Sequence, residues 1–353
     1  MAVEWVIQAD DLTGAADTVV GFAAAGLPTA VLPWPPALPP DAAVLAFDTA
    51  SRDLDPGAAA DRAGMVAQWF AGHCDEHAWL YKKLDSTLRG NAAAELAAVE
   101  QALCAAGRCP SRVVIAPAFP ALGRTTVDGR QHWDGEAVDV ARLLGDPADG
   151  RVERVVVDAW HTEDLDALAD ALEAQPGRPL LVGSGGLAAA HAARRGAPSP
   201  PATAPREAGP VLVVSGSRTP LAARQADVLC RARTLTRLAA EDGEGAARAL
   251  KAGGDVLLMG PATGTPDVAG ALGRATARAL RTGMPRLVIV VGGDTAHAVC
   301  AALGVEALWA EREAAPGAPL LHGTLADGRG LRLVLKSGSF GDDALLAQLV
   351  ASA

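Results

Sequence analysis

The chain has 353 residues, of which 50% are hydrophobic and only 4% aromatic, and its formal net charge at pH 7 is −10. This length is more than one ordinary hydrophobic core needs and predicts two domains. The acidic balance argues against nucleic acid as a partner, because phosphates would be repelled over most of the surface. No apolar run is long enough to suggest a membrane span.

The cysteines and the N-terminus indicate the compartment. The five cysteines are scattered and odd in number, a pattern typical of reduced thiols in an intracellular protein. The first residues, MAVEWVIQADD, carry acids where a signal peptide has a basic start and a longer apolar core. We therefore expect a cytoplasmic protein with reduced cysteines.

Short β-branched runs alternate with alanine-rich helical stretches along the whole chain. Such alternation predicts an α/β fold built from βαβ units around largely parallel sheets. The predicted strands are VEWVIQ, TAVLPW, AAVLAF, WLYKKL, RVVIAP, RVVVDA and PLLVGS in the first part, and VLVVSGS, DVLLMGP, RLVIVVGGD and LRLVLKSGS in the second.

Residues 196–210, GAPSPPATAPREAGP, lose all periodicity and have the composition of an extended linker. We therefore predict a first domain at residues 1–195 and a second at residues 211–353. Each is expected to be a largely parallel sheet flanked by helices, with an active-site cleft between the two. In open α/β sheets ligands bind beyond the carboxyl ends of the strands, and the polar segments of this chain lie there.

Asp10 and Asp11 directly follow the first predicted strand. Paired carboxylates at this position suit Mg²⁺ coordination or abstraction of a hydroxyl proton. The alternative for Asp11 is simple capping of the helix that follows, since acids interact well with exposed helix amides.

The segment KKLDSTLRGN at residues 82–91 combines cations, hydroxyls and a glycine, and fits a small polyhydroxylated carboxylate. Only four of the 31 basic residues are lysines, and two of them begin this segment. Helix capping by Asp85 or Ser86 is the alternative. Neighbouring strand ends add further polar groups. The candidate residues of this site are Lys83, Asp85, Ser86, Thr87, Arg89, Asn91, Ser51, Arg52 and Arg124.

The second domain contains neither a GxxxxGK[ST] loop nor a GxGxxG fingerprint. Three strand ends instead carry glycine and hydroxyl residues, and at GGDT a helix begins at once, an arrangement whose free amides attract anions. Together they indicate nucleotide phosphates. The candidate residues are Ser215, Ser217, Gly292, Gly293, Asp294, Thr295, Lys336 and Gly338.

These motifs together resemble the four-carbon acid sugar kinase family. ADDLTGAAD, KLDSTLRGN and APAFPALGR resemble its substrate-binding domain, and SGSRTP, GGDTA, the PGAP at residues 316–319 and LKSGSFGD resemble its nucleotide-binding domain. The resemblance implies an enzyme that uses ATP to phosphorylate the terminal hydroxyl of 3-oxotetronate, threonate or erythronate. The stretch after Gly135, EAVDVARLLGDPADG, is shorter than the resemblance leads us to expect.

We expect in-line transfer of the γ-phosphoryl group, with Mg²⁺ and cations neutralising the phosphate oxygens. In this hypothesis Asp11 is the base and Arg89 anchors the substrate carboxylate. Lys83 faces the phosphoryl group or the acid, and Asp10 or Asp85 orients the reactants or the metal. The alternatives are a non-catalytic sensor of a sugar acid or nucleotide, and more remotely a dehydrogenase. The metal ligands are left open, and a homodimer is one expectation for the assembly.

Overall fold

The computed structural model describes residues 2–37, 39–147, 150, 152–196, 209–261 and 267–352. The chain divides into two compact units, Met1–Ser199 and Pro200–Ala353. Most of the predicted linker, residues 197–208, lies outside the described residues, so the domain limits stay a prediction.

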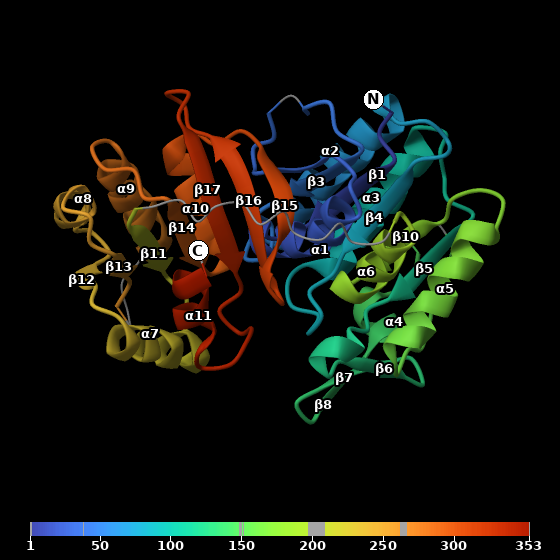
Figure 1. The fold of residues 1–353 in the computed structure, drawn as a ribbon. Coiled ribbons are helices and arrows are strands. Elements are labelled where there is room, and N and C mark those ends of the chain that lie inside the picture. The colour runs from blue at the N-terminus through green and yellow to red at the C-terminus, as the bar shows by residue number, and fades with distance from the viewer. Residues whose placement is uncertain are drawn as a thin grey trace. The chain divides into compact units, whose positions relative to one another are not determined.

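The first unit alternates strands and helices, as its sequence pattern predicts (Figure 1). Its strands are β1 (Trp5–Ala9), β2 (Thr29–Leu32), β3 (Val44–Asp48), β4 (Trp79–Lys83), β5 (Arg112–Ala116), β6 (Thr125–Val127), β7 (Arg130–Trp133), β8 (Glu136–Asp139), β9 (Glu153–Val156) and β10 (Leu180–Gly183). Its helices are α1 (Leu12–Ala24), α2 (Pro56–His73), α3 (Ala92–Ala105), the short η1 (Pro120–Leu122), α4 (Val140–Leu144), α5 (Thr162–Ala174) and α6 (Gly185–Ala193).

The main sheet of this unit has the strand order β2-β3-β1-β4-β10-β5-β9, and every neighbouring pair is parallel. Its central strands are buried on both faces, which explains why they are apolar except near their carboxyl ends. Helices α1, α5 and α6 pack together, and α2 packs with α3.

The connections of this sheet predict where a ligand would bind. From β1 the chain runs through α1 towards β2, whereas from the adjacent β4 it runs through α3 in the opposite direction towards β5. Right-handed crossovers then place α1 and α3 on opposite faces of the sheet. The carboxyl ends of β1 and β4 therefore form a topological switch point, the usual ligand position in open α/β sheets.

A small antiparallel sheet of β6, β7 and β8 belongs to the same unit. Val127 pairs with Arg130, so Asp128 and Gly129 form the two-residue turn, and both have positive φ. The stretch TTVDGRQHWDG at residues 125–135 predicts a hairpin around this Asp-Gly pair, and the structure confirms it.

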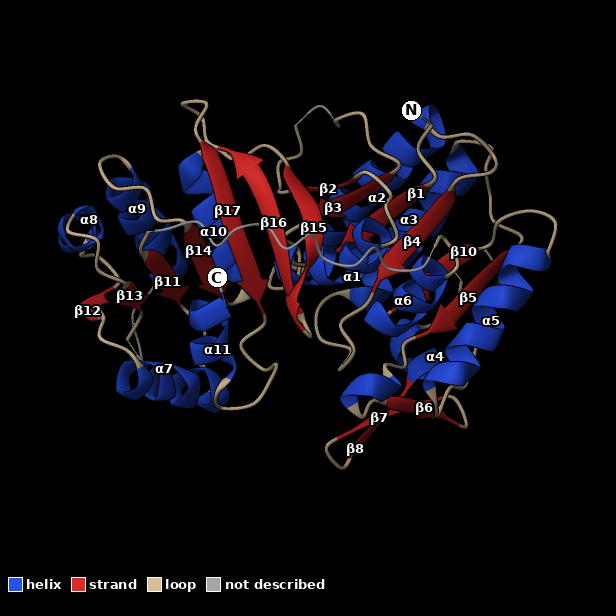
Figure 2. Ribbon diagram, viewed as in Figure 1, coloured by secondary structure: helices blue, strands red, loops and turns tan. Residues whose placement is uncertain are grey.

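The second unit contains β11 (Val211–Ser215), β12 (Thr236–Ala239), β13 (Val256–Met259), β14 (Leu287–Val291), β15 (Leu308–Ala315), β16 (Ala318–Thr324) and β17 (Gly330–Lys336). Its helices are α7 (Pro220–Ala232), α8 (Gly243–Lys251), α9 (Val268–Leu280), α10 (Gly293–Leu303) and α11 (Leu345–Ser352), coloured blue in Figure 2.

The strand order of the second unit is β12-β13-β11-β14-β17-β16-β15. The first four neighbouring pairs are parallel, and β15, β16 and β17 pair in an antiparallel way. From β11 the chain runs through α7 towards β12, whereas from the adjacent β14 it runs through α10 towards β15. A second switch point therefore lies at the carboxyl ends of β11 and β14.

The structure confirms the α/β class and a largely parallel sheet flanked by helices in each unit. It corrects one expectation, because Cys104 and Cys109 form a disulfide between the end of α3 and the start of β5. The prediction that all cysteines are reduced is wrong for this pair. Within the described ranges, no helix combines the length and the apolar character needed to cross a bilayer.

Candidate active site

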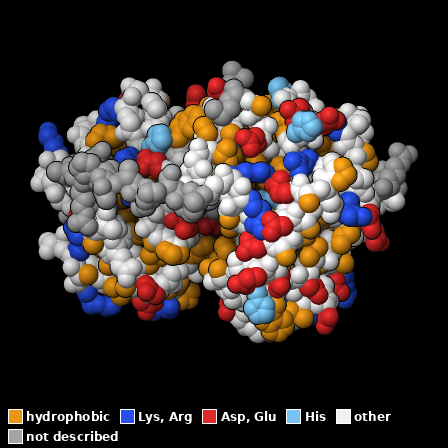
Figure 3. Space-filling view, turned by 45° about the vertical axis from the view of Figure 1, so that its right-hand side comes forward, with side chains coloured by type: hydrophobic (Ala, Val, Ile, Leu, Met, Phe, Trp, Pro, Cys, Tyr) orange, Lys and Arg blue, Asp and Glu red, His pale blue; other side chains and the backbone are white. Residues whose placement is uncertain are grey.

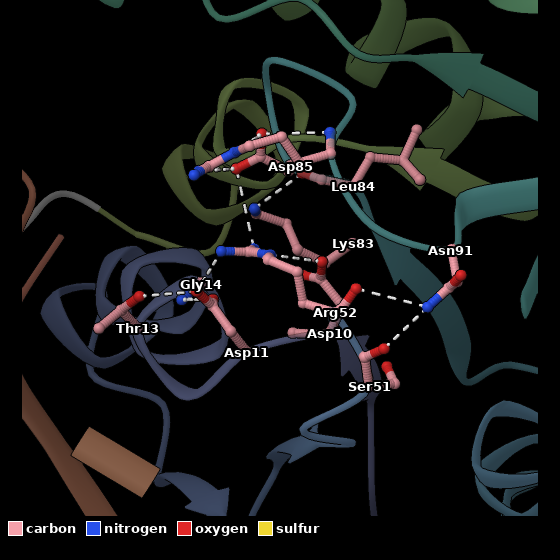
Figure 4. Close-up of polar contacts among 12 residues, drawn as sticks. Asp10, Asp11, Thr13, Gly14, Ser51, Arg52, Lys83, Leu84, Asp85 and Asn91 are labelled. Atoms are coloured by element: carbon pink, nitrogen blue, oxygen red, sulfur yellow. Dashed lines mark hydrogen bonds and ion pairs between the residues drawn. The ribbon is translucent and has the colours of Figure 1, made fainter. Parts of the chain in front are cut away.

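Asp10, Asp11 and Arg52 form the centre of the first site (Figure 4). Arg52 comes from the loop after β3, and its Nε and Nη2 donate to the two carboxylate oxygens of Asp10, each at 2.8 Å. Its Nη1 donates to Asp11 at 2.5 Å. Such forked, charge-assisted contacts fix both the position and the direction of the guanidinium.

Asp11 also caps helix α1, as the alternative interpretation of the sequence proposed. Its carboxylate accepts from the Gly14 amide at 2.6 Å and from the Thr13 hydroxyl at 3.1 Å. Three donors therefore orient it, and a carboxylate has about four acceptor positions. Capping and a role towards a ligand are thus compatible.

Asp85 is the second anchor of the site and follows β4. It accepts from Arg89 Nε at 3.0 Å and Nη2 at 2.7 Å, and from the Thr87 hydroxyl at 2.5 Å. The loop is tight, because Leu88 and Gly90 both have positive φ. A Cβ at Gly90 would lie 2.9 Å from an Asp10 oxygen, so only glycine lets this loop approach the first strand so closely.

Buried charges change the pKa values of these groups. Burial alone would raise the pKa of Asp10, but Arg52, together with Lys82 and Lys83, lowers it below the usual value. Burial likewise opposes the ionised form of Asp85, and its hydrogen bonds with Arg89 and Thr87 lower the pKa. Both carboxylates are ionised acceptors at neutral pH.

Lys82 and Lys83 are neighbours in sequence but have different roles. Successive side chains of a strand point to opposite faces. Lys83 Nζ donates to the Leu84 carbonyl at 2.8 Å, and a Cβ at Gly14 would lie 3.5 Å from it, so this amine lies beside the start of α1. Lys82 Nζ instead pairs with Glu95 of α3 at 2.8 Å inside the protein.

Two residues that the sequence predicts as substrate ligands, Ser51 and Asn91, make hydrogen bonds with other groups of the protein. Ser51 is fully buried, and its hydroxyl donates to Glu95 and lies 2.7 Å from the Thr49 hydroxyl. Asn91 donates to the carbonyls of Ser51 at 3.0 Å and Leu54 at 2.9 Å. Both side chains therefore support the loop that carries Arg52, and their contact with substrate stays a prediction.

Ser86 and Arg124 extend the site towards the small antiparallel sheet. The Arg124 guanidinium donates to the Ser86 hydroxyl, and burial lowers the pKa of Arg124. Gln131 of β7, which the sequence did not single out, donates to the Ser86 carbonyl at 3.0 Å. The only sign in the sequence that Gln131 could be functional is its place in the predicted hairpin, next to His132. Asp17 of α1 is half-buried and acts electrostatically on Arg124.

The second site lies at the switch point of the second unit. Gly292 precedes α10 with φ +111 and, as a glycine, offers no capping side chain, so this helix N-terminus suits an anion. The Gly292 amide donates to the Lys336 carbonyl at 2.9 Å, which joins the ends of β14 and β17. Gly293, exposed Asp294 and buried Thr295 form the first turn of α10.

The three glycine and hydroxyl turns of this unit pack directly on one another. Gly216 leaves no room for a Cβ beside the Thr295 hydroxyl, and a Cβ at Gly338 would lie 2.7 Å from Ser217 Cβ. The Thr219 hydroxyl donates to the Gly338 carbonyl at 2.7 Å. The predicted convergence of the ends of β11, β14 and β17 is therefore present in the structure.

We call the packed turns at Ser215–Thr219, Gly292–Thr295 and Ser337–Gly338 the nucleotide cradle. Two buried polar groups lie at its strand ends. The Ser215 hydroxyl has no hydrogen-bond partner within the described part of the chain. Lys336 is fully buried, its Nζ donates to the Ser337 carbonyl at 2.8 Å, and burial lowers its pKa to about 8. A buried amine and an unused hydroxyl beside a free helix N-terminus suit a phosphate group.

The described residues contain no group of three His, Cys, Asp or Glu side chains placed to hold a metal ion. Asp10, Asp11 and Asp85 are each engaged by an arginine. A dedicated metal cage is therefore not formed by this part of the chain, and the ligands of Mg²⁺ stay undetermined.

On the face drawn in Figure 3, acidic and basic side chains are interspersed with hydrophobic ones. Mixed charge of this kind differs from the positive stripe that binds nucleic acid.

Comparison with known proteins assigns a class to each unit. Residues 5–150 and 134–191 match the family described as "Sugar-binding N-terminal domain", and residues 212–346 match "Nucleotide-binding C-terminal domain". A solved protein of Salmonella typhimurium LT2 has the same fold, with a TM-score of 0.76 at 22% identity over 98% of both chains.

Among curated proteins, the D-threonate kinase of Cupriavidus necator is 35% identical over 98% of this chain and 96% of its own length. That alignment runs over 415 positions, more than the 353 residues of this chain, so the relative contains insertions. The D-threonate kinase of Bordetella bronchiseptica is 34% identical over 96% and 95% of the two chains. A kinase relationship together with a nucleotide-binding domain implies the use of ATP. The chain therefore belongs to the four-carbon acid sugar kinase family and is a kinase.

Proposed function

We propose that the chain transfers the γ-phosphoryl group of ATP to the terminal hydroxyl of a four-carbon sugar acid such as 3-oxotetronate, threonate or erythronate. The observation that carries this proposal is the cluster of Asp10, Asp11, Arg52, Lys83 and Asp85 at the switch point of the sugar-binding unit. Relatives named for D-threonate and D-erythronate support the substrate class.

Arg89 and Arg124 bind the substrate carboxylate in this proposal. Arg52 is already engaged by Asp10 and Asp11, and its side chain is only 17% exposed. Arg89 is 58% exposed, and Arg124 is half-buried and contacts Ser86 on the same loop. Arg89 and Arg124 lie near enough to each other to interact electrostatically, and guanidinium groups recognise a carboxylate well in a forked geometry.

The substrate hydroxyl donates its hydrogen bond to Asp11. A bond forms between that oxygen and the γ-phosphorus while the bond from the γ-phosphorus to the β,γ-bridging oxygen breaks, so that ADP leaves. The proton of the hydroxyl passes to Asp11. The three donors on Asp11 hold the carboxylate in place, so the protein contributes mainly positioning. Lys83 lies beside the start of α1, where its charge faces the transferring group.

The nucleotide phosphates bind the Gly292–Thr295 turn and the facing Ser217 and Gly338. The adenosine part extends across the end of β11 to a hollow of about 430 Å³ at the ends of β12 and β13. This hollow is lined by the apolar Leu238, Ala239, Met259 and Pro261 and by the charged Arg237 and Glu241. Gly260 connects the two regions, because its amide donates to the Ser215 carbonyl at 3.0 Å. An apolar lining with a few polar groups is typical of a base pocket.

Mg²⁺ would be held mainly by the phosphates themselves, with few protein ligands, as is common for this ion. It would neutralise charge on the transferring phosphoryl group. The homodimer stays a prediction, which light scattering of the purified protein tests.

The proposal is tested by measuring ATP consumption with each stereoisomer of threonate, erythronate and 3-oxotetronate. We expect one acid to be phosphorylated at its terminal hydroxyl, which phosphorus NMR of the product identifies. Absence of turnover with all of these acids would contradict the substrate class.

Asp11→Asn tests the base. It should abolish turnover and leave the dissociation constant for ATP nearly unchanged, because Asp11 lies in the sugar-binding unit. Normal turnover by this variant would exclude Asp11 as the base.

A further inference from the structure

A buried ion pair lies beneath the sugar-acid site. Lys82 of β4 and Glu95 of α3 are each 1% exposed, and their charged atoms are 2.8 Å apart. Lys82 Nζ also donates to the Lys83 carbonyl at 3.1 Å. Because both side chains are almost completely buried, direct contact with a substrate does not explain the pair.

The ion pair continues into a chain of hydroxyls, and we call Thr49, Ser51, Lys82 and Glu95 together the buried relay. The Ser51 hydroxyl donates to Glu95 and contacts the Thr49 hydroxyl at 2.7 Å. The Thr49 hydroxyl has one proton, which is within reach of both the Ser51 oxygen and the Ala9 carbonyl at 2.8 Å. The relay therefore connects the carboxyl ends of β1, β3 and β4, where the functional residues begin.

We propose that Glu95 is a positioning residue, which through the buried relay holds the loop of Arg52 in the geometry that the sugar-acid site requires. This inference rests on the proposed function, because it assigns a role within the same acid site.

Helix α3 holds the Arg52 loop from two positions one turn apart. Glu95 binds the side chain of Ser51, and Asn91, four residues earlier, binds the loop carbonyls. The amides of Ser51 and Arg52 donate to the Asp10 carbonyl at 3.0 and 3.3 Å. A shift of this loop therefore moves the guanidinium fork and both aspartates together.

Loss of the Glu95 charge would leave the Lys82 ammonium buried and unpaired, one residue before Lys83. The relay would rearrange, and displacement of a positioned group by about 1 Å costs about 100-fold in rate. Glu95→Gln keeps the shape and an acceptor oxygen, so it tests the charge. Ser51→Ala keeps the ion pair and removes only the connection to the loop.

The same helix offers a matched control. Glu100, five residues further along α3, is also buried and pairs with Arg154 at 2.8 Å. Arg154 otherwise donates to the carbonyls of Leu144 and Gly145, away from the Arg52 loop. Glu100→Gln therefore breaks a similar buried ion pair without touching the relay.

The experiment compares the full-length wild type with Glu95→Gln, Ser51→Ala and Glu100→Gln. The measurements are KM for the sugar acid, KM for ATP, the melting temperature, and hydrogen exchange of the amides in residues 49–54. We expect Glu95→Gln and Ser51→Ala to raise KM for the acid by about tenfold or more. KM for ATP should stay within about twofold, and exchange in the loop should become faster.

Glu100→Gln should lower the melting temperature and leave KM for the acid and the loop exchange as in wild type. If it changes them as much as Glu95→Gln does, the effect is general loosening and the inference is wrong. Wild-type loop exchange in Ser51→Ala and Glu95→Gln would also overturn it. If the wild type phosphorylates no four-carbon acid but the exchange pattern is as expected, the proposed function fails and the positioning role stands.

Discussion

Gly338→Ala tests the nucleotide cradle directly. The Ser217–Thr219 turn lies against Gly338 so closely that an alanine Cβ would be 2.7 Å from Ser217 Cβ and 3.2 Å from the Thr219 hydroxyl. The Cβ atom of Ser217 is bonded directly to the backbone and stays in place when the side chain rotates. Rotation of the hydroxyl therefore cannot relieve the contact. One of the two turns must move.

Overpacking of this kind costs about 1 to 3 kcal/mol. The free protein can relax by separating the turns, but nucleotide binding needs them together, so this energy opposes binding. Since about 1.4 kcal/mol is a factor of ten, the dissociation constant for ATP should rise between about 5-fold and 150-fold. Isothermal titration calorimetry measures it, and KM for the sugar acid should stay as in wild type.

Gly330→Ala is the matched control, because it lies on the same strand β17 and its Cβ would meet no atom of the described residues within 4 Å. Its dissociation constant for ATP should equal that of the wild type. If Gly338→Ala binds ATP as tightly as Gly330→Ala, the turns at Ser217 and Gly338 do not hold the nucleotide.

Two further predictions concern pH. Burial lowers the pKa of Lys336 to about 8, so the ammonium charge is present below this pH and lost as the pH rises. The dissociation constant of the wild type for ATP should therefore increase between pH 7 and 9. In Lys336→Met the increase should be much smaller. Burial lowers the pKa of His191 from 6.5 to about 4, against the opposing effect of Glu173. Because the unfolded chain binds a proton that the folded chain excludes, the free energy of unfolding should fall by about 3 kcal/mol as the pH drops from 6.5 to 4. Urea titrations should show a smaller fall in His191→Gln, and an equal fall would assign the effect to other groups.

Most of the strands that the sequence predicted are buried on both faces, since a continuous apolar run is recognisable without knowledge of its neighbours. The edge strand β9 is only partly buried and was predicted from its valine run. Edge strand β12 was missed because it reads TRLA and is largely exposed. Strands β15 and β16 were missed because charges such as Glu311 and Arg312 interrupt the first, and the PGAP between them was interpreted only as a motif. Such strands depend on their partners rather than on their own composition.

The polar residues at the strand ends were predicted because parallel strands bring their carboxyl ends to one edge. The supporting residues were not predictable in this way. Glu95 lies in an alanine-rich helix, where a glutamate normally faces solvent, and only the fold brings it to Lys82. The different roles of Lys82 and Lys83 likewise required the strand to be placed between α1 and α3.

The small antiparallel sheet has a consequence for evolution of substrate choice. Gln131 ties β7 to the Ser86 carbonyl, and the turn at Asp128 and Gly129 is anchored by Asp158. Changes in the length or sequence of this peripheral hairpin would thus be transmitted to the rim around Ser86 while the aspartates and Arg52 keep their places. Enzymes that diverge in the acid they accept can therefore vary this appendage and retain the chemical centre unaltered.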